Sequence, residues 1–173
     1  MQTQKGIIDS TKEKKIVRLP ITICSSKKTK VKRGYPYRLY NSKRIKSFTE
    51  KYGGFYIILS RTHGLMFSDI KYNQYSDLEM LPDRQLLEVL KKQANQYPEL
   101  YLYFYNPRPL TGDKWFILLE KARFNVKEFR CLKDFDLSQY IHYNELEGYN
   151  NLLEKIKKIN KQKKSMITLE KFW

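Results

Sequence analysis

The sequence predicts an α/β protein, a single three-layer domain in which a central parallel sheet of about four strands lies between helices. Short apolar runs alternate with segments whose apolar residues recur every three to four positions, which is typical of a parallel α/β fold. The run at 55–59 is apolar throughout and stands between glycines, as in a strand buried on both faces. The length of 173 residues suits one domain with its own core.

The expected strands are apolar or β-branched runs that end at a glycine, a proline or a polar cluster. They are 21–24, 55–59, 100–105 and 126–131. The first could begin as early as Ile16, but Pro20 would interrupt the ladder hydrogen bonds of a longer strand. The third strand stops at the segment 106–109, Asn-Pro-Arg-Pro.

The expected helices are segments with apolar residues three and four positions apart. They run from about 42 to 52, 82 to 96, 112 to 122 and 150 to 164. Asn41 or Ser42 can cap the first helix, and Pro82 opens the second at a first-turn position. The stretch from 60 to 81 is expected to be irregular, and a connection of that length in a compact domain is more often functional than idle.

Three regions are expected along the chain. Residues 1–15 form a flexible basic arm, residues 16–135 form the α/β core, and residues 136–173 form a lysine-rich helix and tail that packs on or extends this core. No run approaches the roughly 20 apolar residues that cross a bilayer, and the N-terminus lacks the apolar core of a signal peptide. We therefore expect a cytoplasmic protein with no membrane partner.

The charge balance predicts an anionic partner. Lysine plus arginine outnumber aspartate plus glutamate by 34 to 18, which gives a net charge of +16. Such a field attracts nucleic-acid phosphates. A lysine-rich solubilising surface is the alternative, but that composition usually raises glutamate as well, and here the acidic residues lag. We therefore expect nucleic acid, DNA or tRNA, as the partner.

Cofactor motifs are missing from the sequence. Cys24 and Cys131 belong to no Cys-x-x-Cys pair that would suggest zinc, and there is no Walker loop or dinucleotide glycine motif. This argues against NTPases, NAD enzymes and zinc hydrolases. We expect no cofactor and no metal.

Three residues are candidates for catalysis: His63, Cys24 and Ser60. They are expected near the carboxyl ends of strands, where parallel α/β sheets form their ligand crevice. A histidine pKa lies near neutrality, so His63 could transfer a proton or donate to a leaving base, or else fix its loop by hydrogen bonds. Cys24 is a nucleophile if neighbouring lysines lower its pKa, and a small core residue otherwise. Capping a turn is the alternative for Ser60.

Basic and polar residues after the strands are candidates for gripping phosphates or bases. They are Lys27, Lys28, Lys30, Lys32, Arg33, Arg61, Asn106 and Arg108. Arginine suits a bidentate grip on phosphate. A solvated loop is the alternative for 27–33, a surface position for Arg61, and turn formation beside two prolines for Asn106. The lysines of the C-terminal helix are either a solvated face or a second phosphate-contacting surface.

Three segments resemble an uncharacterised bacterial, archaeal and phage family that carries a Cys-lysine loop, a Leu-Tyr-x-Ser step and an Ile-Leu-Ser-x-x-His-Gly-Leu motif. They are the strand that ends at Cys24 with lysines after it, residues 38–42 (Arg-Leu-Tyr-Asn-Ser) and residues 58–65 (Ile-Leu-Ser-Arg-Thr-His-Gly-Leu). That family is similar to the uracil-DNA-glycosylase-like superfamily, which includes the YaaA peroxide-stress proteins and the lyase domain of archaeosine synthase, a tRNA-modifying enzyme. The resemblance covers about 21–134.

The resemblance implies a uracil-DNA-glycosylase-like fold, with a four-stranded parallel sheet, helices on both sides and a pocket at the strand ends. Similarity to the archaeosine lyase domain adds Tyr40 and Ser42 to the site and supports Cys24. The spacing differs from that domain, and no histidine follows Ser42. The loop after Cys24 offers no carboxylate before Glu50, whereas uracil-DNA glycosylases carry an acidic or amide residue there to direct water.

The leading hypothesis is a nucleic-acid-binding protein that acts on an unpaired or flipped nucleobase in DNA or tRNA, by base excision or base modification. The competing hypothesis is a non-catalytic nucleic-acid-binding module that keeps the fold, motivated by the carboxylate missing after Cys24. A third possibility is an enzyme acting on a free nucleoside or small anionic metabolite. The enzyme requires His63 to share a closed pocket with Cys24, Ser60 or Asn106, and the module does not.

Overall fold

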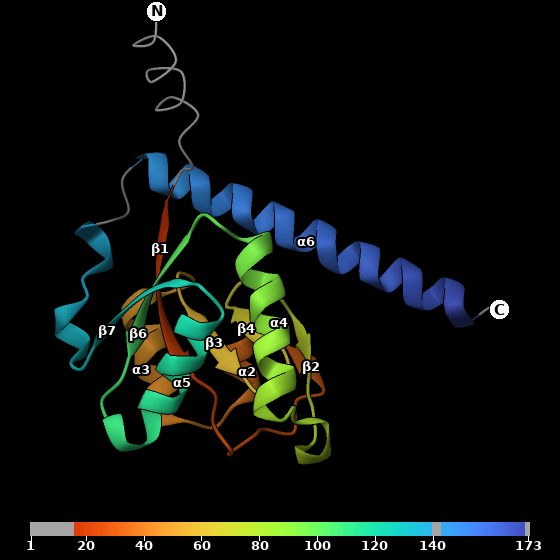
Figure 1. Cartoon of the computed structure of the whole chain (residues 1–173), viewed down its shortest axis with the longest axis horizontal. Helices are drawn as coiled ribbons and strands as arrows, with labels where there is room; N and C mark the ends of the chain where they lie inside the picture. Colours follow the sequence, from red (N-terminus) through yellow and green to blue (C-terminus); the bar gives the residue numbers. More distant parts are fainter. Residues whose placement is uncertain (1–15, 140–142, 172–173) are drawn as a thin grey trace, which may run out of the picture.

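The computed structural model describes residues 16–139 and 143–171, so the expected arm at 1–15 lies outside the described residues (Figure 1). The strands are β1 Val17–Ile23, β2 Arg33–Gly34, β3 Ile57–Ser60, β4 Gly64–Phe67, β5 Tyr72–Asn73, β6 Leu100–Tyr105 and β7 Asn125–Phe129. The α-helices are α2 Pro36–Leu39, α3 Lys43–Tyr52, α4 Asp83–Gln96, α5 Pro109–Lys121 and α6 Tyr143–Lys171. Single 3-10 turns are η1 Asp77–Glu79, η2 Leu132–Asp134 and η3 Leu137–Gln139.

Five strands form one mixed sheet in the order β4-β3-β1-β6-β7. β3, β1, β6 and β7 run parallel, and β4 is antiparallel to β3. β2 and β5 form a separate antiparallel ribbon. The α/β class is therefore confirmed. The expectation of an all-parallel sheet of about four strands is corrected, because the sheet has a fifth strand, β4, that runs antiparallel. The finer likeness to uracil-DNA glycosylases stays a prediction.

β4 replaces the first part of the irregular stretch expected at 60–81. All four of its residues are buried. Gly64, at φ 69°, pairs with Ser60 where the chain turns back from β3 into β4. The run Gly-Leu-Met-Phe is a short apolar strand signal, but the polar segment 60–63 before it favoured a loop.

β1 is longer than expected because Pro20 lies within it. β6 pairs with β1 from Val17 to Ile21, but β3 pairs with β1 only from Ile21 onward. Pro20 therefore stands where β1 has a partner on one side only, a position at which a strand tolerates proline. The expected start of this strand at Ile21 is therefore wrong. The strand begins at Val17, because the interruption predicted from Pro20 does not occur.

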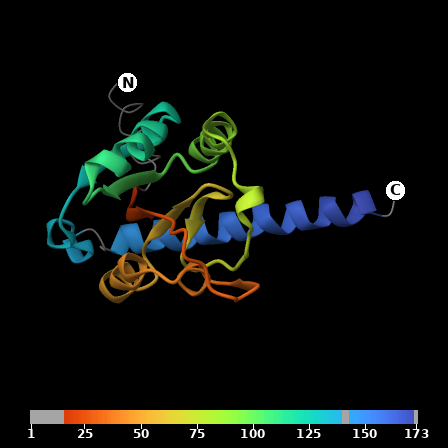
Figure 2. The same cartoon turned by 90° about the horizontal axis from the view of Figure 1, so that it is seen from below.

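Helices cover both faces of the sheet. α4, α5 and α6 contribute to one core cluster, and α2 and α3 contribute to the other. Figure 2 shows α4 and α5 on one side of the sheet and α3 on the opposite side. Ile45, Phe48 and Tyr52 are the buried residues of α3, which confirms the predicted spacing and the helix end before Gly53.

α6 is the longest helix, with 29 residues, and is longer than the expected segment 150–164. Its residues Leu152, Leu153 and Ile156 are buried in the cluster that also contains β1 and α4. Figure 1 shows α6 running along one end of the sheet and on past the other elements toward the C-terminus. Within 16–139 and 143–171, no helix combines the length and apolarity that a bilayer crossing needs.

The strand order fixes where a ligand crevice forms. From β1 the chain continues to β3 on one side, and from β6 it continues to β7 on the other side. β1 and β6 are neighbours, so their C-terminal loops leave in opposite directions. In open α/β sheets this switch point opens a crevice at the carboxyl ends of the strands.

Candidate functional site

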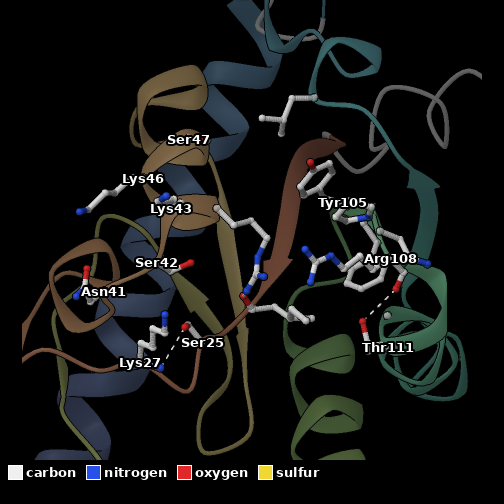
Figure 3. Close-up of a pocket in the computed structure, with 17 residues that line it drawn as sticks. Ser25, Lys27, Asn41, Ser42, Lys43, Lys46, Ser47, Tyr105, Arg108 and Thr111 are labelled. Carbon is white, nitrogen blue, oxygen red and sulfur yellow. Dashed lines mark hydrogen bonds between the residues drawn. The ribbon is translucent and has the colours of Figure 1, made fainter.

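A cleft of about 960 Å³ opens at this switch point (Figure 3). Its walls are the loop after β1, the first turns of α3, the end of β6 and the first turn of α5. In Figure 3, Asn41, Ser42 and Lys43 lie on one side, and Tyr105, Arg108 and Thr111 lie on the other. The predicted position of the crevice thus coincides with a cleft in the structure.

The lining of the cleft is strongly cationic. Of its 17 residues five are basic and none is acidic. The basic residues are Lys27, Lys43, Arg44, Lys46 and Arg108. A concave surface that carries only positive charge focuses its field and concentrates anions.

Arg44 is held at the cleft by the backbone and side chain of β1 and the residue after it. Its Nε donates to Thr22 Oγ1 at 3.0 Å, and its Nη2 donates to the carbonyl oxygens of Ile23 at 2.8 Å and Cys24 at 3.1 Å. Burial lowers the pKa of the guanidinium, which is still far too high for it to lose its charge. No described carboxylate pairs with it. A partly buried charge without a counterion is costly, so a bound anion would stabilise this arrangement.

Two helices begin at the cleft. Ser42 caps α3 by accepting a hydrogen bond from the Ile45 backbone N–H at 3.4 Å, and Lys43 and Arg44 follow. α5 begins after Arg108 with no side-chain cap. Neither helix has an acidic residue in its first turn. Cations at these positions oppose the helix dipole, whereas a bound anion would be favoured by both the dipole and the cations.

Asn106 is a rigid polar group in the cleft lining, only 1% exposed. Its Nδ2 donates to Asp113 Oδ1 at 2.8 Å and to Glu128 Oε2 at 2.9 Å, which fixes the orientation of the amide. Its Oδ1 is buried without a hydrogen-bond partner. A Cβ on Gly112 would stand 1.9 Å from Oδ1, so only glycine fits beside this amide. Asn106 Oδ1 is therefore an unpaired acceptor that is packed against Gly112 and has almost no exposed surface.

The basic loop after β1 is folded against the segment before α3. The Asn41 N–H donates to the Lys27 carbonyl at 2.8 Å, and the Thr29 N–H donates to the Leu39 carbonyl at 3.0 Å. Gln74 Nε2 donates to both the Leu39 and Thr29 carbonyls. These bonds hold Lys27 beside the first turn of α3, although its own side chain is exposed.

Tyr40 and Tyr75 form a buried pair beside the cleft. Their hydroxyl groups lie 2.8 Å apart, and Tyr40 is 2% exposed. Burial raises the pKa of both hydroxyls, and the neighbouring Cys24 raises the pKa of Tyr75 further. Cys24 is partly buried and packs against both core clusters. Tyr40 therefore stabilises the core rather than facing a ligand.

His63 lies outside the cleft. Its ring is 5.3 Å from that of Tyr72 and 5.8 Å from that of Tyr75. Burial lowers the pKa of the imidazole, and a hydrogen bond with the Asn73 backbone opposes this effect. Its Nε2 is buried without a partner. His63 instead lines a second groove, of about 600 Å³, which Arg33 also lines.

Ser60 and Arg61 have structural partners. Ser60 is fully buried, and its Oγ accepts from the backbone N–H groups of Thr62 and His63, as in a turn cap. Arg61 donates to Asp83 and to the Leu81 carbonyl, and its guanidinium lies 5.0 Å from the Trp115 ring centroid. These contacts are the alternatives that the sequence left open for both residues.

The structure thus divides the predicted site residues. Four of them share the cleft: Lys27, Ser42, Asn106 and Arg108. Lys28 lies over the Tyr75 ring, with Nζ 4.2 Å from the centroid, and Lys30 and Lys32 are exposed at neither hollow. Arg44, Lys43 and Lys46 were missed, although two cations directly after a helix cap are an unusual signal.

Metal ligands do not gather in the part of the chain that the structure describes. No three His, Cys, Asp or Glu side chains among those residues lie close enough together to hold an ion. Comparison with protein-family models, with curated proteins and with solved structures finds no match for this chain.

Proposed function

We propose that this protein binds nucleic acid and holds an unpaired nucleotide in the switch-point cleft. The observation that carries the proposal is Arg44, a partly buried guanidinium with no described carboxylate partner, in a cleft lined by five cations and no acid. Phosphate matches the donors of a guanidinium and the first turns of α3 and α5. The net charge of +16 favours a polyanion over a single small anion.

The shape of the cleft favours an unpaired nucleotide. Ligand pockets for small molecules have volumes of roughly 300–1,000 Å³, and the cleft, at about 960 Å³, has room for one nucleotide. A stacked base cannot enter such a hollow, so the nucleotide has to be single-stranded or flipped out of its helix.

Binding without catalysis is the function that the geometry supports best. His63 lines the second groove, Ser60 is fully buried in a turn, and neither faces the cleft. Cys24 does not line the cleft either. The enzyme hypothesis gains no support from this cleft, because His63, Cys24 and Ser60 do not join Asn106 in its lining.

A base-modifying or base-excising enzyme is the second candidate. Asn106 is the residue that favours it, because its amide lies in the cleft lining and is held rigidly by Asp113 and Glu128, two carboxylates that could take part in acid-base chemistry. Mass spectrometry of DNA and tRNA after incubation with the protein tests this candidate. A released or altered base that the wild type produces and Asn106→Ala does not would establish the enzyme. An unchanged base composition would leave binding as the function.

Salt-dependent binding tests the main proposal. Fluorescence anisotropy is measured with a single strand of about 16 nucleotides, the upper range for one small binding domain. The variant changes Lys27, Lys43 and Lys46 to glutamine, and the matched control changes the exposed Lys92, Lys121 and Lys127. On a single strand, each phosphate that a lysine no longer neutralises lowers the slope of log affinity against log salt by about 0.7.

The cleft variant should therefore show a slope shallower by up to about 2, because three lysines are replaced. The control removes the same three charges and should keep a slope close to that of the wild type. Equal effects of the two variants would mean that only the net charge matters. Absence of binding by the wild-type protein would refute the proposal.

A further inference from the structure

The second groove lies beyond the edge strand β4. One wall is the β2–β5 ribbon, and the other wall is α6. Its volume is about 600 Å³. It shares no lining residue with the switch-point cleft, so the two hollows are separate.

The lining of this groove combines cations with aromatic rings. Arg33 and Lys71 stand on the ribbon side, and Lys157 and Lys161 stand on α6. The one acidic residue in the lining, Asp69, has its Oδ2 bound by the Tyr149 hydroxyl at 2.9 Å. Five rings also belong to the lining, but Phe67 and Tyr97 are core residues, so Tyr35, His63 and Tyr72 are the partly exposed ones. Cations that neutralise phosphates beside rings that contact bases are the pattern of single-strand binding.

His63 contributes an uncharged ring to the lining of this groove. Its Nε2 is buried without a hydrogen-bond partner. Burial lowers the pKa of the ring, so the imidazole is neutral at neutral pH and does not add to the charge of the groove. Nε2 has almost no exposed surface, so a ligand in the groove would contact the ring of His63 rather than this atom.

A row of side chains connects the cleft to the groove. Lys27 lines the cleft, and the adjacent Lys28 places its Nζ 4.2 Å from the Tyr75 ring centroid. The Tyr75 ring meets that of His63 edge to face at 5.8 Å, and His63 lines the groove. Tyr75 is only 5% exposed, so these contacts connect the two hollows through the interior and do not form a surface path between them.

We propose that the groove binds a second segment of the same nucleic-acid strand, which makes single-stranded nucleic acid the partner of this protein. The inference rests on the proposed function of the cleft. A single strand can turn its bases into two separate hollows, whereas the stacked and paired bases of a duplex cannot. Phosphates would lie on the cations of Arg33, Lys71, Lys157 and Lys161, and bases would contact the partly exposed rings of Tyr35, His63 and Tyr72.

The test compares a long single strand with a short one and with a duplex. The groove variant changes Lys157 and Lys161 to glutamine, and its matched control changes Lys121 and Lys127. All four lysines are exposed. The salt bridge between Lys157 and Glu154, at 3.7 Å, is exposed as well and contributes little to stability, so both variants should fold. The labelled probes are a strand of about 16 nucleotides, a trinucleotide and a duplex of the long strand.

We expect the groove variant to bind the long strand up to about 25-fold more weakly at 0.1 M salt, with a slope shallower by about 1.4. Its affinity for the trinucleotide, which the cleft alone can hold, should stay the same. Arg33→Gln with Lys71→Gln, on the opposite wall, should reproduce both results. The duplex should bind more weakly than the single strand.

Three results would overturn the inference and leave the proposed function standing. They are unchanged affinity of the groove variant for the long strand, an equal decrease for the trinucleotide, and tighter binding of the duplex. The second result would make the groove an independent small-ligand site. Failure of the wild-type protein to bind any probe would instead refute the proposed function, so the two failures are distinguishable.

Discussion

Replacement of Arg44 by methionine tests the anion site most directly. Methionine keeps an unbranched stem of similar reach but removes the guanidinium and its charge. No described carboxylate pairs with Arg44, so the substitution leaves no unpaired acid behind. Any change in nucleic-acid binding then reports on Arg44 itself.

The expected decrease in affinity follows from the contacts that a phosphate would make. Hydrogen bonds to charged groups contribute about 1.5–3 kcal/mol, which corresponds to roughly 10- to 150-fold in affinity. The slope of log affinity against log salt should become shallower by about 0.7 on a single strand. Arg44→Lys keeps the charge but not the two N–H groups of Nη1, the guanidinium nitrogen for which the described hydrogen bonds give no acceptor, so it should restore the slope and only part of the affinity.

The expected decrease in stability is modest. Arg44 donates to Thr22, which is fully buried, and to two backbone carbonyls. An acceptor left without its donor costs about 1–3 kcal/mol, and removal of a partly buried charge offsets part of this cost. The protein should remain folded, because the free energy of unfolding of a small domain is about 5–15 kcal/mol. Urea unfolding without nucleic acid measures this difference.

Arg61→Met is the matched control. Arg61 is also partly buried after a parallel strand, but it bonds to Asp83 and the Leu81 carbonyl and lies over Trp115. Its replacement should lower stability by a similar amount and leave nucleic-acid affinity unchanged. If both variants bind as the wild type does, or if both bind equally weakly, Arg44 does not anchor an anion.

Three further substitutions test other parts of the structure. Gly112→Ala should lower the free energy of unfolding in urea by about 1–3 kcal/mol, because the new Cβ would lie 1.9 Å from Asn106 Oδ1. Alanine in place of glycine inside a helix normally raises stability by about 1 kcal/mol. A gain in stability would contradict the packing around Asn106. Burial lowers the pKa of His63 in the folded protein, so the unfolded chain binds this proton at a higher pH than the folded protein does. The wild type should therefore lose stability as the pH falls below about 6.5, the ordinary pKa of histidine. His63→Gln should reduce that decrease between pH 7 and pH 5, and identical pH profiles of the two proteins would refute this cause. A triple change to glutamine at Lys27, Lys28 and Lys30 should reduce the slope of log affinity against log salt on a single strand by about 0.7, because only Lys27 lines the cleft. A reduction of about 2 would place the binding surface on the loop itself.

Periodicity was enough to predict most of the fold. The spacing of Ile45, Phe48 and Tyr52 predicted α3, and the apolar run at 100–105 predicted β6 with the observed bounds. β4 was missed because its four residues follow a polar turn and give too short a run to separate a strand from a loop. The length of β1 depended on where β3 begins to pair with it, which is a tertiary property.

The site was harder to predict because proximity depends on topology. Lys27, Ser42, Asn106 and Arg108 come from three separate segments and share the cleft only because β1 and β6 are neighbours. The sequence cannot show that neighbouring strands diverge at this point. It also placed His63 with them, since the carboxyl end of β3 is at the same edge of the sheet, but the side chain turns toward Tyr72 and the second groove.

Local rules that hold elsewhere in the chain are broken at the cleft. Asp83 stands in the first turn of α4, which matches the helix dipole, whereas the first turn of α3 holds Lys43 and Arg44. Arg61 is paired with a carboxylate, whereas Arg44 is not. Asn106 keeps an unpaired buried acceptor. Conflicts of this kind reduce stability, and in natural proteins they concentrate where a ligand resolves them. The cations at the start of α3 and the unpaired Arg44 are conflicts of the kind that a bound phosphate resolves, whereas Asn106 Oδ1 has almost no exposed surface that a ligand could reach.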